Sequence, residues 1–223
     1  MSSHRRSHGM RTRAVHAGEH PDPGTGAAAP NLVMSTTFVT EDAATGFSAH
    51  SLTDDAPYLY SRWSNPTVRQ LELKLADLEN GEDAVAFGSG MAAATGLFFS
   101  VLKASDHVVV SDVSYAGVAE LARETLPHLG IRVSTVDLSD LAELQRTVLP
   151  TTRLVYAETP VNPLLRLADI QALGDIAHAA GAELAVDSTL ATPLATRPLD
   201  LGADYVLHSL TKYIGGHGDA LGG

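Results

Sequence analysis

The chain has 223 residues, of which 15 are lysine or arginine and 26 are aspartate or glutamate, so its formal net charge is −11. This acidic balance argues against nucleic acid or an anionic membrane surface as the main partner. Hydrophobic residues make up 44% of the chain, which is enough for a buried core. No cysteine is present, which excludes disulfides, thiolate nucleophiles and cysteine-ligated metal centres.

The first part of the chain, residues 1–64, is expected to form an N-terminal arm and loop that contact a neighbouring subunit. Its first 30 residues combine arginine, histidine, proline, glycine and small residues without periodicity, so they lack a core of their own. Arg5 and Arg6 are not followed by the apolar stretch of a secretion signal, and no long apolar run occurs elsewhere. We therefore expect a cytoplasmic protein without a membrane segment.

One helix is clearly marked after this arm. Asn65 is a typical cap, Pro66 suits the first helical position, and Asn80 with Gly81 marks the end. The apolar residues between these signals recur with helical spacing on one face: Val68, Leu71, Leu75 and Leu78.

Beyond this helix, short apolar segments alternate with helical patterns. Strands are predicted at residues 84–87, 108–111, 131–136, 154–157, 184–186 and 205–207. Helical patterns lie at residues 117–126, 140–148 and 168–180. The later strands begin 21 to 30 residues apart, which is the spacing of a βαβ repeat. Residues 65–223 are thus predicted to form an α/β domain with a mostly parallel, doubly wound sheet flanked by helices.

Polar and glycine-rich segments follow the predicted strands, and parallel sheets bind ligands at the carboxyl ends of their strands. These segments are residues 88–91, 112–115, 158–163, 187–189 and 209–212. A rim that combines a helix start, hydroxyls, an aromatic ring, an acid and a lysine predicts a site for an anionic ligand with a ring.

The segment Gly88–Ala93 opens an alanine-rich helix, so the backbone N–H groups of Gly90 and Met91 can bind a phosphate. The same segment matches Gly-x-Gly-x-x-Ala, and Asp112 lies at the end of the next strand, as in a dinucleotide-binding fingerprint. A nicotinamide-dependent oxidoreductase is therefore one alternative. A glycine turn that serves only close packing is another.

Lys212 and Asp187 follow successive strands. An amine beside a phosphate site can form a Schiff base with an aldehyde cofactor, and Ser209 and Thr211 can add hydrogen bonds to the phosphate. A carboxylate at Asp187 can pair with a pyridinium nitrogen and keep the ring protonated. Taken singly, Lys212 could be a surface charge and Asp187 a helix cap.

Other residues have weaker signals. Tyr115 can stack on a planar ring or belong to the core, and Asn162 can direct its amide from a proline-rich segment or simply form a turn. Arg62, two residues after Tyr60, can bind a carboxylate or phosphate or serve loop packing. The histidines form no metal-binding pattern, so we expect no metal site.

Several sequence motifs together resemble the Cys/Met-metabolism family of pyridoxal-phosphate enzymes. This family includes cystathionine γ-synthases, cystathionine γ- and β-lyases, methionine γ-lyases and O-acylhomoserine sulfhydrylases. The matching segments cover nearly the whole chain and are residues 12–18, 35–38, 60–67, 88–91, 158–163, 187–193 and 208–216.

The resemblance implies a fold-type I enzyme that binds pyridoxal 5′-phosphate. Lys212 would bind the cofactor covalently and move protons, Asp187 would pair with the ring nitrogen, and Tyr115 would stack on the ring and assist proton transfer. Asn162 would lie beside the ring hydroxyl. The remaining cofactor-binding residues would hold the phosphate: Gly90, Met91, Ser209 and Thr211, with Tyr60 and Arg62 from a neighbouring subunit.

The resemblance also implies a homo-oligomer, a dimer or tetramer with shared active sites, and a small amino-acid substrate. The implied reaction is γ-elimination or γ-replacement on sulfur amino acids or O-acylhomoserine. Gly117 stands where similar methionine γ-lyases carry a cysteine, which argues against that assignment. The family continues into a C-terminal domain with the arginine for the substrate carboxylate, and we expect this domain to be missing. A catalytically silent half that needs a partner chain is thus a further alternative.

Overall fold

The computed structural model describes residues 8–40 and 57–223. The chain divides into two compact units, Met1–Val85 and Ala86–Gly223. The sequence places the boundary at residue 65 instead, because the well-marked helix begins there. That assignment of residues 65–223 to one functional domain stays a prediction.

The first unit contains the helices α1 (Met10–His16) and α2 (Pro66–Glu79). The predicted helix after Asn65 is confirmed, since the Asn65 side chain accepts a hydrogen bond from the Thr67 N–H at 2.9 Å. Asn80 ends it with a left-handed backbone conformation (φ 59°).

An ion pair joins the two helices of this unit. Arg13 Nε lies 2.7 Å from Asp77 Oδ2, and Arg13 Nη2 donates a hydrogen bond to Asn80 Oδ1 at 2.8 Å. Gly18 lies beside the same helix, where an added Cβ would come within 2.8 Å of the Gln70 carbonyl oxygen. Part of the predicted arm is thus packed against α2.

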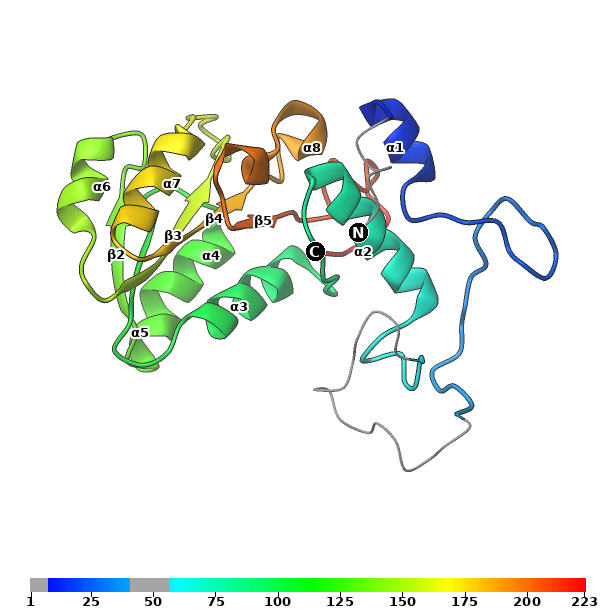
Figure 1. The fold of residues 1–223 in the computed structure, drawn as a ribbon. Helices are drawn as coiled ribbons and strands as arrows, with labels where there is room; N and C mark the ends of the chain where they lie inside the picture. Colours follow the sequence, from blue (N-terminus) through cyan, green and yellow to red (C-terminus); the bar gives the residue numbers. More distant parts are fainter. Residues whose placement is uncertain (1–7, 41–56) are drawn as a thin grey trace. The chain divides into compact units, whose positions relative to one another are not determined.

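The second unit is built on a five-stranded sheet (Figure 1). Its strands are β1 (His107–Ser111), β2 (Arg132–Val136), β3 (Thr152–Glu158), β4 (Glu183–Asp187) and β5 (Tyr205–Leu207). Their order in the sheet is β2-β1-β3-β4-β5, and every neighbouring pair is parallel. The parallel sheet predicted from the sequence is therefore confirmed. The strand order changes direction between β1 and β3, which is where such sheets bind ligands.

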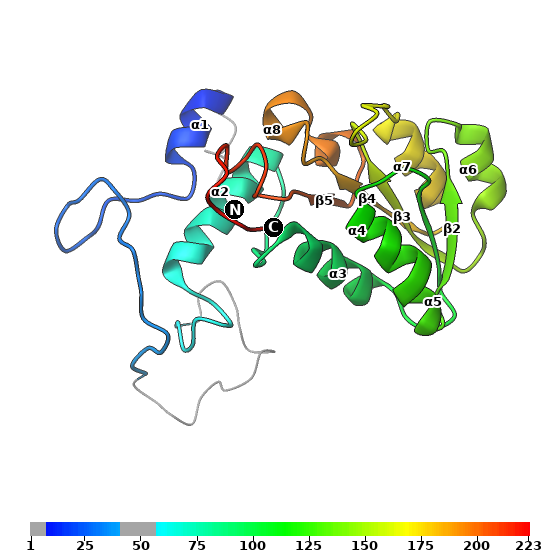
Figure 2. The ribbon, with the colours of Figure 1, turned by 180° about the vertical axis from the view of Figure 1, so that it is seen from behind.

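Helices cover both faces of this sheet (Figure 2). They are α3 (Gly90–Val101), α4 (Ala116–Glu120), a π-helical turn (Leu121–Thr125), α5 (Leu126–His128), α6 (Leu141–Thr147), α7 (Ile170–Ala179), α8 (Thr192–Ala195) and a 3-10 turn (Pro198–Leu201). Alternate residues of β1, β3 and β4 belong to two separate cores. Val108 and Val110 pack with the helices α3 to α5, whereas Val109 packs with α6 and α7. The doubly wound architecture follows from these two cores.

The predicted strand at residues 84–87 is wrong. No strand of the described sheet pairs with this segment, and Phe87 instead exchanges two backbone hydrogen bonds with Gly223, at 2.7 and 3.0 Å. An apolar pattern favours an extended backbone, but a strand also needs a partner along several residues. Such a partner is not evident from the segment itself.

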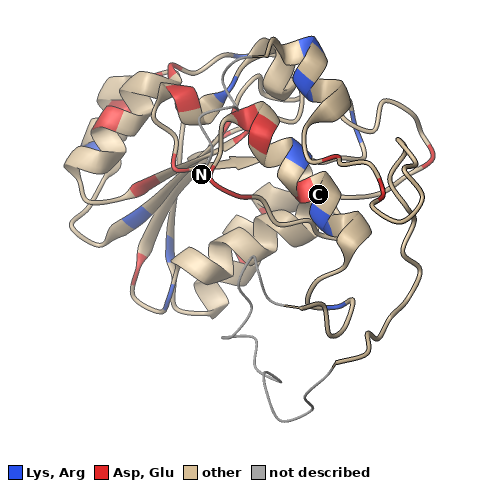
Figure 3. Cartoon of the chain, turned by 45° about the vertical axis from the view of Figure 1, so that its right-hand side comes forward, with Lys and Arg blue, Asp and Glu red and all other residues tan. Residues whose placement is uncertain are grey.

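Charged residues are distributed over many elements of the described chain. In Figure 3 the lysine and arginine residues do not gather into one cluster in this view. Within residues 8–40 and 57–223, no helix has the length and apolar character needed to cross a lipid bilayer. The same residues contain no group of three or more metal-ligating side chains.

Candidate active site

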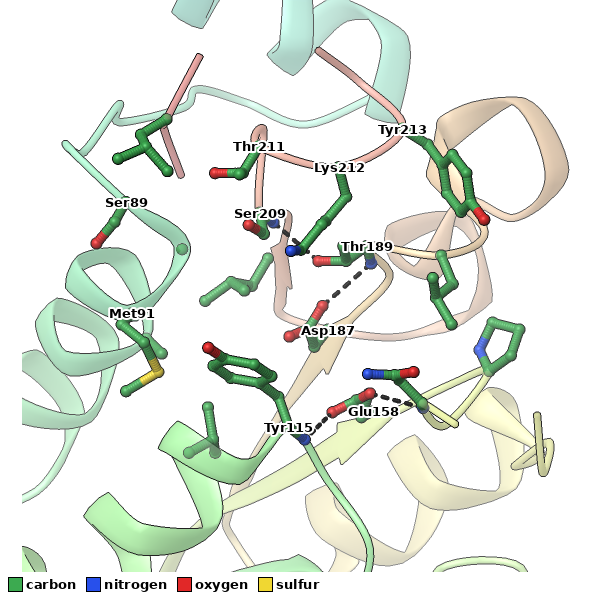
Figure 4. A pocket seen from close by; sticks show the side chains of 18 of the residues that line it. Ser89, Met91, Tyr115, Glu158, Asp187, Thr189, Ser209, Thr211, Lys212 and Tyr213 are labelled. Carbon is green, nitrogen blue, oxygen red and sulfur yellow. Dashed lines mark hydrogen bonds between the residues drawn. The ribbon is translucent and has the colours of Figure 1, made fainter. Parts of the chain in front are cut away.

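A cavity of about 760 Å³ opens at the carboxyl ends of the strands (Figure 4). Its walls come from the start of α3, from the residues that follow β1 and β5, and from the last residues of β3 and β4. Eight of the ten residues that the sequence predicts for the site line this cavity: Gly90, Met91, Tyr115, Asn162, Asp187, Ser209, Thr211 and Lys212.

The start of α3 forms one wall. The Ser89 side chain caps the helix by accepting a hydrogen bond from the Ala92 N–H at 3.1 Å, and the Ala93 N–H is bonded to the Ser89 carbonyl. The N–H groups of Gly90 and Met91 precede this first helical bond, in the part of a helix that attracts anions.

A glycine is needed at position 90 because Ser209, in the segment after β5, lies very close to it. A Cβ on Gly90 would lie 2.8 Å from the Ser209 Cβ. Because Gly90 has no side chain, the start of α3 and the segment after β5 can pack closely beside the cavity. The hydroxyl of Ser209 and the N–H groups of α3 are brought to the same wall.

The segment that carries Lys212 is fixed by hydrogen bonds on both sides. The Ser209 N–H donates to the Thr189 hydroxyl at 2.8 Å. The Thr211 hydroxyl donates to the Gly222 carbonyl at 3.3 Å and accepts from the Gly222 N–H at 3.2 Å. Because a hydroxyl has a single proton, Thr211 offers no free donor in this arrangement. Its predicted bond to a phosphate requires that proton to leave Gly222.

Asp187 is one of two buried acids that line the cavity. Its carboxylate accepts hydrogen bonds from the Thr189 N–H at 3.0 Å and from the Tyr156 hydroxyl at 3.3 Å. Burial raises the pKa of Asp187, because a low-dielectric surrounding disfavours the charged form. Lys212 and Asp187 both line the cavity, and their side chains point toward its interior in Figure 4.

Glu158 is a cavity residue to which the sequence assigned no role. Its Oε2 accepts a hydrogen bond from the Tyr115 N–H at 2.6 Å, and its Oε1 accepts from the Asn162 N–H at 2.9 Å. Burial raises the pKa of Glu158, and the two N–H bonds act in the opposite direction. The sequence offered one signal for a role of Glu158 in the site: like Asp187, it is an acid at the end of a buried strand.

The ring of Tyr115 lies close to Met91 and Gly117. A Cβ on Gly117 would come within 2.9 Å of the Met91 sulfur and 3.0 Å of the Tyr115 Cε1. A larger residue at position 117 therefore requires the tyrosine ring or the methionine to move.

Asp112 does not serve a dinucleotide in this structure. Its carboxylate is ion-paired with the Arg166 guanidinium, which also lies 2.8 Å from Asp137. Asp112 is not among the residues that line the cavity. The oxidoreductase alternative needs this acid free for a ribose, so the geometry does not support it.

Tyr60 and Arg62 belong to the first unit. The Arg62 guanidinium carbon lies 4.9 Å from the centroid of the Tyr60 ring, which is the distance of a cation–π contact. The predicted role of both residues at a neighbouring subunit's phosphate stays a prediction.

Comparison with known proteins identifies relatives that are enzymes of sulfur amino acids. A cystathionine gamma-synthase of Mycobacterium tuberculosis is 42% identical, over 100% of this chain and 56% of the relative. An L-methionine gamma-lyase of Fusobacterium nucleatum subsp. polymorphum is 43% identical, over 98% of this chain and 55% of the relative. The chain therefore spans about half the length of the curated relatives it matches.

Solved structures agree with this result. A crystal structure of metB from Corynebacterium glutamicum matches with a TM-score of 0.89 and 38% identity, over 98% of this chain and 55% of the other. A cystathionine gamma-lyase from Lactobacillus plantarum, solved with L-serine, matches with a TM-score of 0.88 and 37% identity, over 96% of this chain and 54% of the other. The fold-type I architecture expected from the sequence is confirmed. Because the family model also matches residues 11–223, the chain belongs to the Cys/Met metabolism PLP-dependent enzyme family.

Proposed function

We propose that this chain carries the cofactor-binding site of an enzyme for γ-elimination or γ-replacement on sulfur amino acids or O-acylhomoserine. The observation that carries the proposal is the meeting of Lys212, Asp187 and the N-terminus of α3 around one cavity. Lone residues of these types are common, but together they provide an amine, a buried acid and an anion site.

The donor set suits pyridoxal 5′-phosphate, whose aldehyde, ring and phosphate need different partners. The phosphate requires N–H and hydroxyl donors, which Gly90, Met91 and Ser209 provide. The aldehyde requires the Lys212 amine. The protonated ring nitrogen requires a carboxylate. Of the two buried acids that line the cavity, Glu158 already accepts two backbone N–H bonds, so Asp187 is assigned this role.

Each residue then has a distinct chemical role. When bound, the cofactor supplies an electron sink for charge that develops at the substrate's Cα. Asp187 keeps its carboxylate beside the cationic nitrogen, which favours the ionised acid against the effect of burial. Lys212 Nζ takes and returns protons at the substrate carbons, and Tyr115, which lines the same cavity, assists this transfer.

The partners are part of the proposal. The substrate is a small amino acid, and the enzyme works in the cytoplasm, where amino-acid metabolism supplies such molecules. Tyr60 and Arg62 reach the phosphate of a neighbouring subunit, so the enzyme is a homo-oligomer, a dimer or tetramer with shared sites. A guanidinium suits that role because it binds phosphate oxygens in a bidentate manner.

Covalent trapping tests the proposal. The chain contains three lysines, Lys74, Lys103 and Lys212, so attachment sites are easily separated by peptide mass spectrometry. After incubation with pyridoxal 5′-phosphate and borohydride reduction, we expect the phosphopyridoxyl group on Lys212. The variant Lys212→Arg should lose this label, whereas Lys103→Arg should keep it. A label confined to Lys74 or Lys103, or no label at saturating cofactor, contradicts the proposal.

A second measurement separates an active chain from a catalytically silent half. Release of the γ-substituent is measured, without borohydride, for the chain saturated with pyridoxal 5′-phosphate and for the same chain mixed with the C-terminal half of a relative. Activity only in the mixture supports a role as a half that needs a partner. Full turnover by the chain alone rejects that alternative.

A further inference from the structure

Glu158 is a buried carboxylate that the proposed chemistry does not use. It ends β3, is 6% exposed, and lies beside Asp187 of β4 in the register of the sheet. Residues paired in this way point to the same face, so two acids are neighbours at the cavity. A buried carboxylate is unfavourable unless donors satisfy it, so its partners indicate why it is there.

Its two partners are backbone groups from two separate segments. The Tyr115 N–H, at the start of α4 after β1, donates to Oε2 at 2.6 Å. The Asn162 N–H, in the segment after β3, donates to Oε1 at 2.9 Å. One carboxylate therefore holds both segments at the point where the strand order changes direction.

Both segments also place cavity residues. Tyr115 and Asn162 both line the cavity, and Figure 4 shows the Glu158 carboxylate beside the backbone of Tyr115. Tyr115 is 48% exposed, so packing alone does not fix the direction of its ring. A hydrogen bond to a charged acceptor at its own N–H fixes the backbone from which the ring extends.

We infer that Glu158 is a positioning residue, which sets the places of Tyr115 and Asn162 for a cofactor in the cavity. The inference rests on the proposed function for the identity of that cofactor. It assigns to Glu158 no contact with the reacting atoms.

The chemistry of the two bonds explains why this position carries a glutamate. An ionised carboxylate is an acceptor at both oxygens, so it serves two N–H donors at once. A glutamine has one acceptor oxygen, and its NH₂ group would face the second N–H donor. An aspartate keeps the charge, but its side chain is one methylene shorter.

Hydrogen exchange of individual amides tests the geometry without any cofactor. We expect Glu158→Gln to speed exchange of the Tyr115 or the Asn162 amide by about tenfold, since one charge-assisted bond is lost. Glu183→Gln is the matched control, because it is the same change at the opposite end of β4, where Glu183 accepts a bond from Tyr205. It should leave both amides unchanged. Unchanged exchange of both amides in Glu158→Gln overturns the inference.

Circular dichroism of the bound cofactor then separates positioning from a structural role alone. In Glu158→Gln we expect attachment at Lys212 to persist, with a weaker visible signal and an affinity for pyridoxal 5′-phosphate lower by about tenfold. Glu158→Asp should show both effects as well, and it provides the test if Glu158→Gln does not fold. A wild-type signal and affinity together with faster amide exchange mean that Glu158 only supports the fold, which overturns the inference. If the wild-type chain itself binds no cofactor at Lys212, the proposed function fails, whereas the exchange result still stands.

Discussion

Two pairs of strand-end acids differ in their surroundings. Glu158 and Asp187, at the ends of β3 and β4, are 6% and 7% exposed and are held by N–H and hydroxyl donors. Asp112 and Asp137 follow β1 and β2, their side chains are 38% and 36% exposed, and both are ion-paired with Arg166.

The difference indicates which acids are available to a cationic ligand. Asp112 and Asp137, the outer pair, already have a cation in Arg166. The pKa of Asp137 is lowered, mainly because the Ser139 hydroxyl and N–H donate hydrogen bonds to it. Glu158 and Asp187, the inner pair, have raised pKa values because they are buried. A buried acid without a full counter-charge gains most from a cationic ring nitrogen.

The largest expected effect comes from Asp187→Asn. The amide keeps acceptor capacity for the Thr189 N–H but removes the negative charge. Removing one partner of a buried ion pair costs about 3 to 5 kcal/mol, so the affinity for pyridoxal 5′-phosphate should fall by roughly two to four orders of magnitude. Titration by visible absorbance measures this change. A loss of less than tenfold contradicts the assignment of Asp187 as the counter-ion.

The pH dependence of stability gives an intermediate effect. Asp187 and Glu158 have pKa values above their ordinary values, so the folded chain without cofactor binds more protons than the unfolded chain. The free energy of unfolding should therefore decrease as the pH rises from the ordinary pKa values of these acids through the raised ones.

Urea denaturation at a series of pH values measures this decrease. Asp187→Asn should reduce it, because one of the two acids is then absent. Asp112→Asn changes an exposed acid, so it should leave the decrease in the free energy of unfolding unchanged. A wild-type stability that rises through the same interval would show that other groups outweigh the buried pair.

The smallest effect is expected for Asp112→Asn itself. The change removes one of the two carboxylates that pair with Arg166, and partly exposed ion pairs contribute about 0 to 1 kcal/mol. We expect thermal unfolding to shift only slightly and cofactor affinity to remain as in the wild-type chain. A strong loss of cofactor binding would contradict the separation between the inner and outer acids.

Local patterns were sufficient where one segment determines its own structure. Asn65 and Asn80 mark the ends of α2, and the apolar segment at residues 205–207 coincides with β5. The residues after each strand could be assigned to one rim because parallel strands share a direction. Lys212 and Asp187 were brought together by this rule.

Partners that are distant in the sequence could not be predicted in the same way. The Tyr115 N–H finds Glu158 across 43 residues, and Asp112 finds Arg166 across 54 residues. The failed strand at residues 84–87 has the same cause, since pairing depends on a backbone elsewhere in the fold. Local composition indicates the type of element. Which acids are already paired within the protein depends on contacts between residues that are distant in the sequence.

A crystal structure of this chain with pyridoxal 5′-phosphate tests the central claim most directly. We expect continuous density from Lys212 Nζ to the cofactor, with the ring nitrogen about 3 Å from the Asp187 carboxylate. A cofactor bound away from Lys212, or with its ring nitrogen turned away from Asp187, would contradict the account.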